Sequence, residues 1–193
     1  QLTVVSTLLA LFTDITLLVL GGNLKRRERF SARLGDILSQ LYLGSAVLKY
    51  FQDHGQADDE LPYVQWCIQT CLHRSQIAFK ELANNFPIKW LRLILRSIIP
   101  YGKMYSQPTD HLCHQVVKPM LSLNPLRERL TKNFYLSKNR QEWLPQLEEV
   151  FRLITEVEPI AKKFESAIRH GKVPVWLSFS EQVRAALKEG ILS

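Results

Sequence analysis

Residues 11–50 read LFTDITLLVLGGNLKRRERFSARLGDILSQLYLGSAVLKY. The apolar stretch that fills residues 3–20 ends at Gly21-Gly22, and a charged turn follows it. Beyond the turn, apolar side chains recur at the i, i+3 and i+4 spacing of one helix face: Phe30, Leu34, Ile37, Leu38, Leu41 and Leu48. The stretch therefore predicts a helix buried in a bundle, a basic turn, and a second helix with one buried face.

The rest of the chain has the same helical character. A third helix is expected at 59–84, where Asp58 or Asp59 can cap its start and Pro62 fits its first turn. Shorter helices follow, at 88–99, 108–121, from 125, 143–157, from Pro159 to Gly171, and from Ser178 to Gly190. No segment alternates with period two for long enough to predict a sheet. The predicted fold is all-α, an antiparallel helix bundle with several shorter flanking helices.

We expect one helical domain over residues 1–193, because a chain of this length can bury a single core. Its long helices would span 3–29, 30–52 and 59–84. Residues 1–86 would then form the core of the bundle, and the shorter helices of 87–193 would pack on it.

The charge of the chain is unevenly placed. The formal net charge is +7, yet residues 61–140 alone carry 12 basic and 3 acidic side chains. Such a basic region favours phosphates, anionic lipid or an acidic protein face, and a solvated surface without a partner is the open alternative. We expect no nucleic-acid partner, because no recognition motif accompanies the charge.

The three cysteines do not form a disulfide pattern, which favours a reducing compartment. We expect a cytoplasmic protein, with peripheral attachment to the cytosolic face of the inner membrane as a further option. Cys67, Cys71 and His73, like His111, Cys113 and His114, lack the paired loop spacing of zinc sites. The sequence predicts no metal-binding, catalytic or cofactor-binding residue.

The stretch from residue 11 to 50 closely resembles the C-terminal region of the bacterial long-chain acyl-coenzyme A dehydrogenases. The matching parts are Val19-Leu20-Gly21-Gly22, Leu24-Lys25-Arg26-Arg27-Glu28-Arg29, Ser31-Ala32-Arg33-Leu34-Gly35-Asp36 and Ser39-Gln40-Leu41-Tyr42-Leu43. Looser landmarks continue to Phe134-Tyr135-Leu136-Ser137, whereas residues 138–147 match poorly.

The resemblance implies that the parent enzyme uses FAD to oxidise fatty acyl-coenzyme A in the first step of β-oxidation. The flavin site and the catalytic carboxylate of that family lie upstream, so this chain would be an accessory domain that supports assembly. Its expected partner is the catalytic body, and a second subunit and an anionic membrane surface stay open as further partners. The alternative is a freestanding lipid- or protein-binding helical module without dehydrogenase activity.

Asp14 is the only charged side chain among the first twenty residues. Since buried charges are normally paired, we expect a buried ion pair between Asp14 and Arg33 on the following helix. Residues 2–20 are nearly long enough to span a bilayer. Asp14 near the middle argues against that reading, at a cost of about 3 kcal/mol on insertion scales.

Two basic segments are candidate surfaces. A turn with Lys25, Arg26, Arg27 and Arg29 could dock on the catalytic body. The sharper candidate is a membrane or partner surface formed by Lys89, Trp90, Arg92, Arg96 and Lys103. Cations and apolar residues at helical spacing beside an aromatic are typical of a helix at a membrane interface. An amphipathic bundle helix with snorkelling cations is the alternative.

Overall fold

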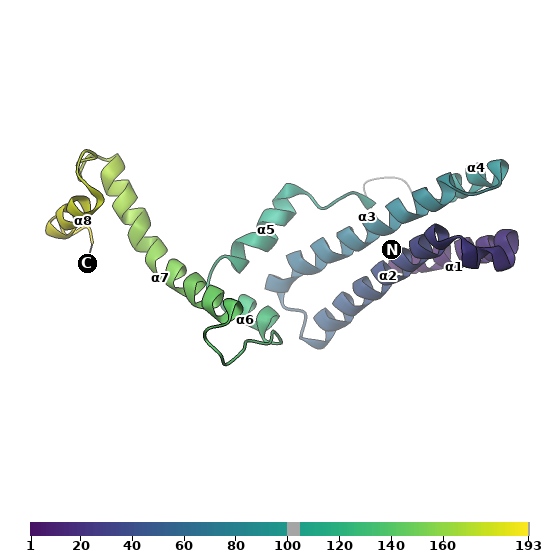
Figure 1. The fold of residues 1–193 in the computed structure, drawn as a ribbon, viewed down its shortest axis with the longest axis horizontal. Helices are drawn as coiled ribbons and strands as arrows, with labels where there is room; N and C mark the ends of the chain where they lie inside the picture. Colours follow the sequence, from purple (N-terminus) through teal and green to yellow (C-terminus); the bar gives the residue numbers. More distant parts are fainter. Residues whose placement is uncertain (100–104, 193) are drawn as a thin grey trace. The chain divides into compact units, whose positions relative to one another are not determined.

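The computed structural model describes residues 1–99 and 105–192. These residues form eight α-helices and two 3-10 turns and contain no strand, which confirms the all-α prediction (Figure 1). The elements are α1 (Leu2–Leu20), η1 (Gly21–Arg26), α2 (Glu28–Asp53), η2 (Asp58–Glu60), α3 (Leu61–Asn84), α4 (Lys89–Ile98), α5 (Asp110–Met120), α6 (Pro125–Thr131), α7 (Trp143–Arg169) and α8 (Phe179–Lys188).

The chain divides into two compact units, Gln1–Val117 and Lys118–Ser193. We expected one domain with an internal boundary after residue 86. That expectation stays a prediction, while α4 packs into the same core as α1–α3. The second unit has a small core of its own, formed by Ala167, Val173 and Ala186.

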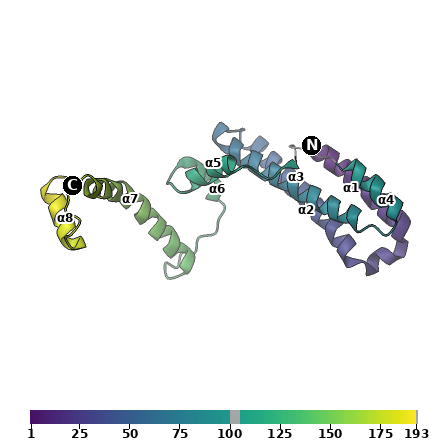
Figure 2. The same cartoon turned by 90° about the horizontal axis from the view of Figure 1, so that it is seen from above.

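The first unit is built on an antiparallel pair of long helices. Figures 1 and 2 both show α2 and α3 side by side, joined by the short segment around η2. Helix α1 packs on this pair. Its buried residues Val5, Leu8 and Phe12 recur at helical spacing, and the Phe12 ring meets Phe79 of α3 edge-on at 4.9 Å between centroids. On α2 the predicted face is buried at Phe30 and Ile37, whereas Leu38 and Leu48 of that face are exposed.

Gly44 lets α1 and α3 approach α2 closely. A Cβ atom placed on this buried glycine would lie 3.2 Å from Leu2 of α1 and 3.5 Å from Ile68 of α3. Gly35, on the same helix, has nothing within 4 Å of the corresponding position. Of these two glycines, only Gly44 makes a close helix contact.

Helices α4 and α5 complete the first unit. Leu91 and Leu95 of α4, with Ile99 beyond its end, join the core beside α1 and α3. The hydroxyl of Tyr63 on α3 donates a hydrogen bond of 2.7 Å to the carbonyl of Val116 on α5. Residues 89–99 therefore belong to the main core rather than to a set of helices packed outside it.

In the second unit, α6 lies against α7 and α8 against the end of α7. Arg127 of α6 donates two hydrogen bonds, of 2.6 and 2.9 Å, to the Glu148 carboxylate, and its guanidinium lies 4.3 Å from the centroid of the Phe151 ring. A capping box begins α8, since Ser178 and Glu181 satisfy each other's backbone and side-chain groups.

Helix α7 corrects one prediction. We expected a helix to end near residue 157 and a new one to begin at Pro159, but α7 runs unbroken through Pro159 to Arg169. A proline inside a helix removes one backbone hydrogen bond, here at the carbonyl of Thr155. Because Pro159 is exposed, water can satisfy a carbonyl on that side of the helix, and the break is not required.

Candidate membrane or partner surface

Helix α4 has three distinct faces. Leu91 and Leu95 point into the core of the first unit and are almost fully buried. A second face is apolar but exposed, and a third carries cations. A bundle helix normally turns one apolar stripe inward and a polar face outward, so the second apolar face is the unusual feature of α4.

The exposed apolar face of α4 consists of four side chains: Trp90, Leu93, Ile94 and Ile98. Between 36% and 69% of each residue's surface is accessible to solvent. At about 100° per residue these positions fall on one side of the helix, and Leu93 borders the cationic face. They form a contiguous apolar strip that no described part of the first unit covers.

The cationic face consists of Lys89, Arg92 and Arg96. Lys89 and Arg96 are exposed, and neither forms an ion pair with any described residue. Arg92 is half-buried, and its Nε donates a short hydrogen bond to the carbonyl of Phe86, just before the helix. Arg92 therefore fixes the entry to α4, while Lys89 and Arg96 are free to meet a partner. Lys103 lies outside the described residues.

The basic turn is also placed on the surface. Lys25 and Arg26 lie in η1, Arg27 joins η1 to α2, and Arg29 is in the first turn of α2. All four are exposed, and none forms an ion pair among the described residues. The positive charge of these four side chains is therefore not neutralised by an ion pair within the described part of the chain.

The predicted buried ion pair between Asp14 and Arg33 is wrong. Asp14 is exposed on α1, so water solvates its carboxylate and no partner is needed. Arg33 instead donates from Nε to the carboxylate of Glu81 on α3, at 2.9 Å. The pair joins α2 to α3. Its two residues are far apart in the sequence, so the spacing of residues within one helix could not predict it.

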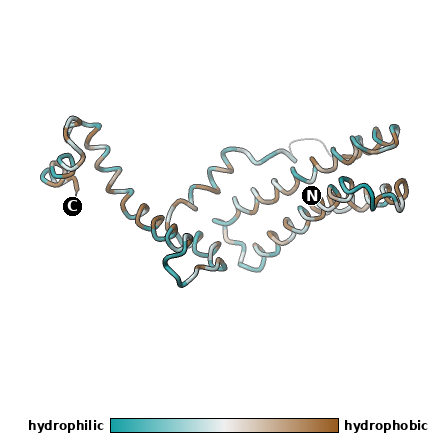
Figure 3. Tube along the Cα trace, viewed as in Figure 1, coloured by the Kyte–Doolittle hydropathy of each residue, from teal (hydrophilic) through white to brown (hydrophobic). Residues whose placement is uncertain are grey.

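Helix α1 also bears on whether this chain contacts a membrane. The helical stretch Leu2–Arg26 is long and apolar enough to cross a membrane by length and composition, and 28% of its most apolar window is buried. Figure 3 shows apolar residues over most of α1. Its inner face is used for the core, whereas Leu18 on the outer side is 89% exposed.

The described residues offer no group of three or more histidine, cysteine or acidic side chains that could hold a metal ion. Burial raises the pKa of the Cys67 and Cys71 thiols, so these remain protonated near neutral pH. The hollow enclosed by Val5, Leu8 and Phe79 has about 10 Å³, far too small for a flavin.

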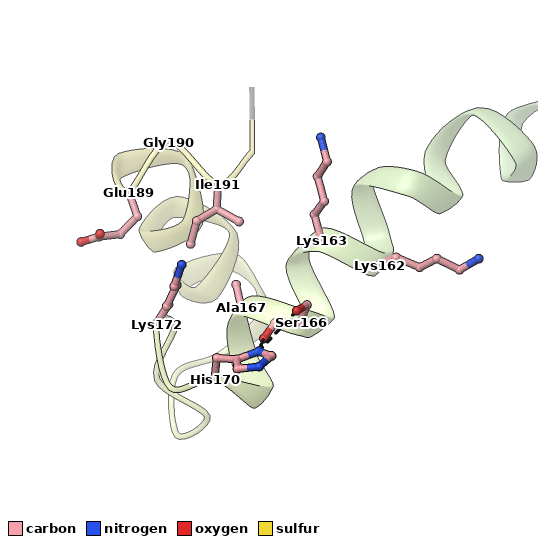
Figure 4. A pocket seen from close by; sticks show the side chains of 9 residues that line it. All are labelled: Lys162, Lys163, Ser166, Ala167, His170, Lys172, Glu189, Gly190 and Ile191. Carbon is pink, nitrogen blue, oxygen red and sulfur yellow. Dashed lines mark hydrogen bonds between the residues drawn. The ribbon is translucent and has the colours of Figure 1, made fainter.

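A larger open hollow lies where the end of α7 meets the turn after α8 (Figure 4). Lys162, Lys163, His170 and Lys172 line it, together with Glu189. In Figure 4 the Lys162 and Lys163 side chains point in different directions, and Lys162 pairs with Glu158 at 2.6 Å. The cations do not converge, so this hollow is not a built anion site.

The sequence analysis missed a second exposed apolar face, which runs along α7. The side chains of this face recur at helical spacing in the sequence, at Trp143, Leu147, Val150, Ile154 and Val157. All five lie within the helix expected at 143–157, but helical spacing alone does not show whether an apolar face is buried or exposed.

Comparison with known protein families gives one match over the whole length. Residues 1–193 match the model of the family described as acyl-CoA dehydrogenase, C-terminal, bacterial type. A search of solved structures found no match.

Proposed function

This chain belongs to the bacterial-type C-terminal family of the acyl-CoA dehydrogenases, and from that membership we propose that it is a noncatalytic accessory domain of an FAD-dependent enzyme of fatty acid β-oxidation. The catalytic body, with the flavin and the catalytic base, would lie upstream of residue 1. The accessory domain would support assembly and hold the enzyme at an anionic membrane surface, where long-chain substrates partition. Its location would be cytoplasmic, peripheral to the inner membrane.

The observation that carries the membrane role is the combination of faces on α4. Leu91 and Leu95 fix the helix to the core, so the strip around Leu93 is presented on a rigid body. Helices that lie in a membrane interface insert an apolar face to a depth of roughly 5–10 Å and keep cations at the headgroups. Trp90 suits the boundary between the two regions because its ring is apolar and its indole N–H is polar.

The chain's charge supports the same role. The region from residue 61 to 140, which includes α4, carries the chain's positive excess. Each lysine or arginine near an anionic surface contributes about 1 kcal/mol to binding. Lys89 and Arg96 have no acidic partner among the described residues, so their attraction is not already neutralised.

The experiment is sedimentation of the intact enzyme with vesicles of phosphatidylethanolamine and phosphatidylglycerol. Charge reversal by Lys89→Glu with Arg96→Glu should lower binding at least tenfold, since both charges change sign beside the headgroups. Arg92 is left unchanged because it holds the start of α4. The matched control is Lys172→Glu with Lys188→Glu, two exposed lysines of the second unit, which should bind as the wild type does. Equal binding by both variants would refute the membrane role.

The alternative, a freestanding helical module, makes a different prediction about the gene. An accessory domain requires a flavoprotein body in the same reading frame, immediately upstream of Gln1. A reading frame that starts at this domain would favour the module.

A further inference from the structure

Helix α7 carries an apolar seam with a heptad repeat. Trp143, Leu147, Val150, Ile154, Val157, Ala161, Phe164 and Ile168 follow one another at alternating steps of four and three residues. A spacing of 3.5 residues is the pattern of a helix that packs along a second helix of the same kind. Figure 3 shows the apolar residues recurring along the length of α7.

Only the far end of this seam is covered by the chain itself. Phe164 and Ile168 pack against the core of the second unit, where the Phe164 ring contacts Phe179 of α8 edge-on. The five side chains from Trp143 to Val157 are between 49% and 71% exposed. Both Pro145 and Pro159 lie on the side of α7 opposite the seam, where they do not obstruct a neighbouring helix.

We propose that the seam of α7 from Trp143 to Ala161 binds the same seam of a second copy of this chain, as an antiparallel helix pair. This inference rests on the proposed role in assembly and names the surface that performs it. The vesicle experiment changes only α4 and the experiment below changes only α7. The membrane role and the helix pair can therefore be refuted independently.

The exposed area is sufficient for such a pair. With Leu144, Leu153 and Ile160 beside it, the seam exposes on the order of 900 Å² per copy, so pairing two copies could remove up to about twice that area from water, which exceeds the roughly 1,000 Å² that a specific interface needs. Without a partner this apolar face would be larger than the patches that single soluble proteins usually expose.

The sizes of the seam residues favour the antiparallel direction. In one antiparallel register, Trp143 faces Ala161 of the other copy, Leu147 faces Val157, and Val150 faces Ile154. Every layer then pairs a larger with a smaller side chain, which lets the layers interdigitate. A parallel pair would place Trp143 against itself. It would also put valine where parallel dimers prefer leucine.

The side chains that flank the seam fit this register. Leu153 would meet Leu153 of the other copy, and no glutamate would face another across the flanks of the seam. The paired helices also run in opposite directions, so their macrodipoles attract.

Disulfide trapping in the intact enzyme tests the pair and its direction. Leu147→Cys and Val157→Cys are made as separate proteins, mixed, and oxidised mildly. The mixture should give a covalent dimer in at least tenfold higher yield than either protein alone, because residue 147 faces residue 157 only across the antiparallel pair. The wild type, with its native cysteines, measures the background.

Two further variants test whether dimer formation depends on the seam itself or is disturbed by any charge added to α7. Ile154→Asp, added to both cysteine proteins, should reduce the yield to background, since it puts an unpaired charge in the central layer. Ser166→Asp adds the same charge to the exposed opposite side of α7 and should leave the yield unchanged. Dimers formed by each cysteine protein alone would overturn the antiparallel pair in favour of a parallel one. Background yield in every sample would overturn self-association through α7.

Discussion

Gly44 and Gly35 lie nine residues apart on α2, yet only Gly44 determines how closely helices pack. The side chains of Leu2 and Ile68 occupy the space where a Cβ at Gly44 would lie, whereas Gly35 faces open space. Glycine in the interior of a helix loses more conformational entropy on folding than alanine does. Close packing of the helices offsets this entropy cost at Gly44. No close contact offsets it at Gly35.

Replacing each glycine should therefore change stability in opposite directions. Gly35→Ala should raise the free energy of unfolding by about 0.5–1 kcal/mol, and Gly44→Val should lower it by about 1–3 kcal/mol through overpacking against Leu2. Urea unfolding followed by circular dichroism measures both. Equal effects of the two substitutions would contradict the close approach at Gly44.

The pair of Arg127 and Glu148 should make the second unit sensitive to acid. The hydrogen bonds from Arg127 hold the pKa of Glu148 below its ordinary value. A lowered folded-state pKa contributes stability above the unfolded pKa, and this contribution is lost as the pH falls through the folded value. The pair is partly exposed, with 40% of the Glu148 side chain accessible, so the effect should be at most about 1 kcal/mol.

Glu148→Gln should lower stability at pH 7, and this deficit should shrink toward pH 3 as the Glu148 carboxylate of the wild type takes up a proton. Urea midpoints at the two pH values measure the difference. Glu189→Gln, at an exposed position without an ion pair, is the control and should follow the wild type at both. A Glu148→Gln deficit that persists at pH 3 would mean that packing, not charge, holds α6 on α7.

At the scale of the element, α4 combines a packing role and a surface role on different faces. Leu95 is fully buried and Leu93 is 69% exposed, although the two residues are identical and only two positions apart. Leu95 should therefore contribute to the stability of the fold, and Leu93 to the binding of a partner.

Leu95→Ala should reduce the free energy of unfolding by about 2–5 kcal/mol, because it leaves a cavity in the core. Leu93→Ala should change stability by less than about 0.5 kcal/mol and should weaken vesicle binding of the intact enzyme. Thermal unfolding and sedimentation measure the two effects. Loss of stability with Leu93→Ala would show that this face is covered in the folded protein.

Local sequence patterns predicted the helices better than the contacts between helices. The helices α2 and α3 follow from apolar residues spaced within a turn or two, and both form, although Leu38 and Leu48 of the face predicted to be buried on α2 are exposed. The Arg33–Glu81 pair joins residues 48 positions apart, and helical spacing holds no information about such a contact. Pro159 misled the prediction because the rule against interior proline weakens at an exposed position.

The candidate surface was also predictable only in part. Lys89, Trp90 and Arg96 are exposed as a partner surface requires. The sequence could not show that Arg92 serves the start of α4. Nor could it show which of the apolar residues of α4 would be left outside the core.

At the scale of the whole molecule, the two units have separate cores, one around Phe12 and Phe79 and one around Ala167 and Ala186. Their stabilities should be separable. Phe79→Ala should lower the protection of α2 and α3 amides against hydrogen exchange by about 3–5 kcal/mol, and it should leave the amides of α8 unchanged. Exchange followed by mass spectrometry distinguishes this from a single cooperative fold, in which both would change together.

A probe on the exposed face of α4 can show whether this helix places the enzyme on a membrane surface. Leu93→Cys in the intact enzyme would be labelled with an environment-sensitive fluorophore, with Leu187→Cys, on exposed α8, as the control. Adding anionic vesicles should shift the emission of the Leu93 probe to the blue and leave the Leu187 probe unchanged. Emission from the Leu93 probe that stays unchanged while the enzyme sediments with the vesicles would contradict the claim.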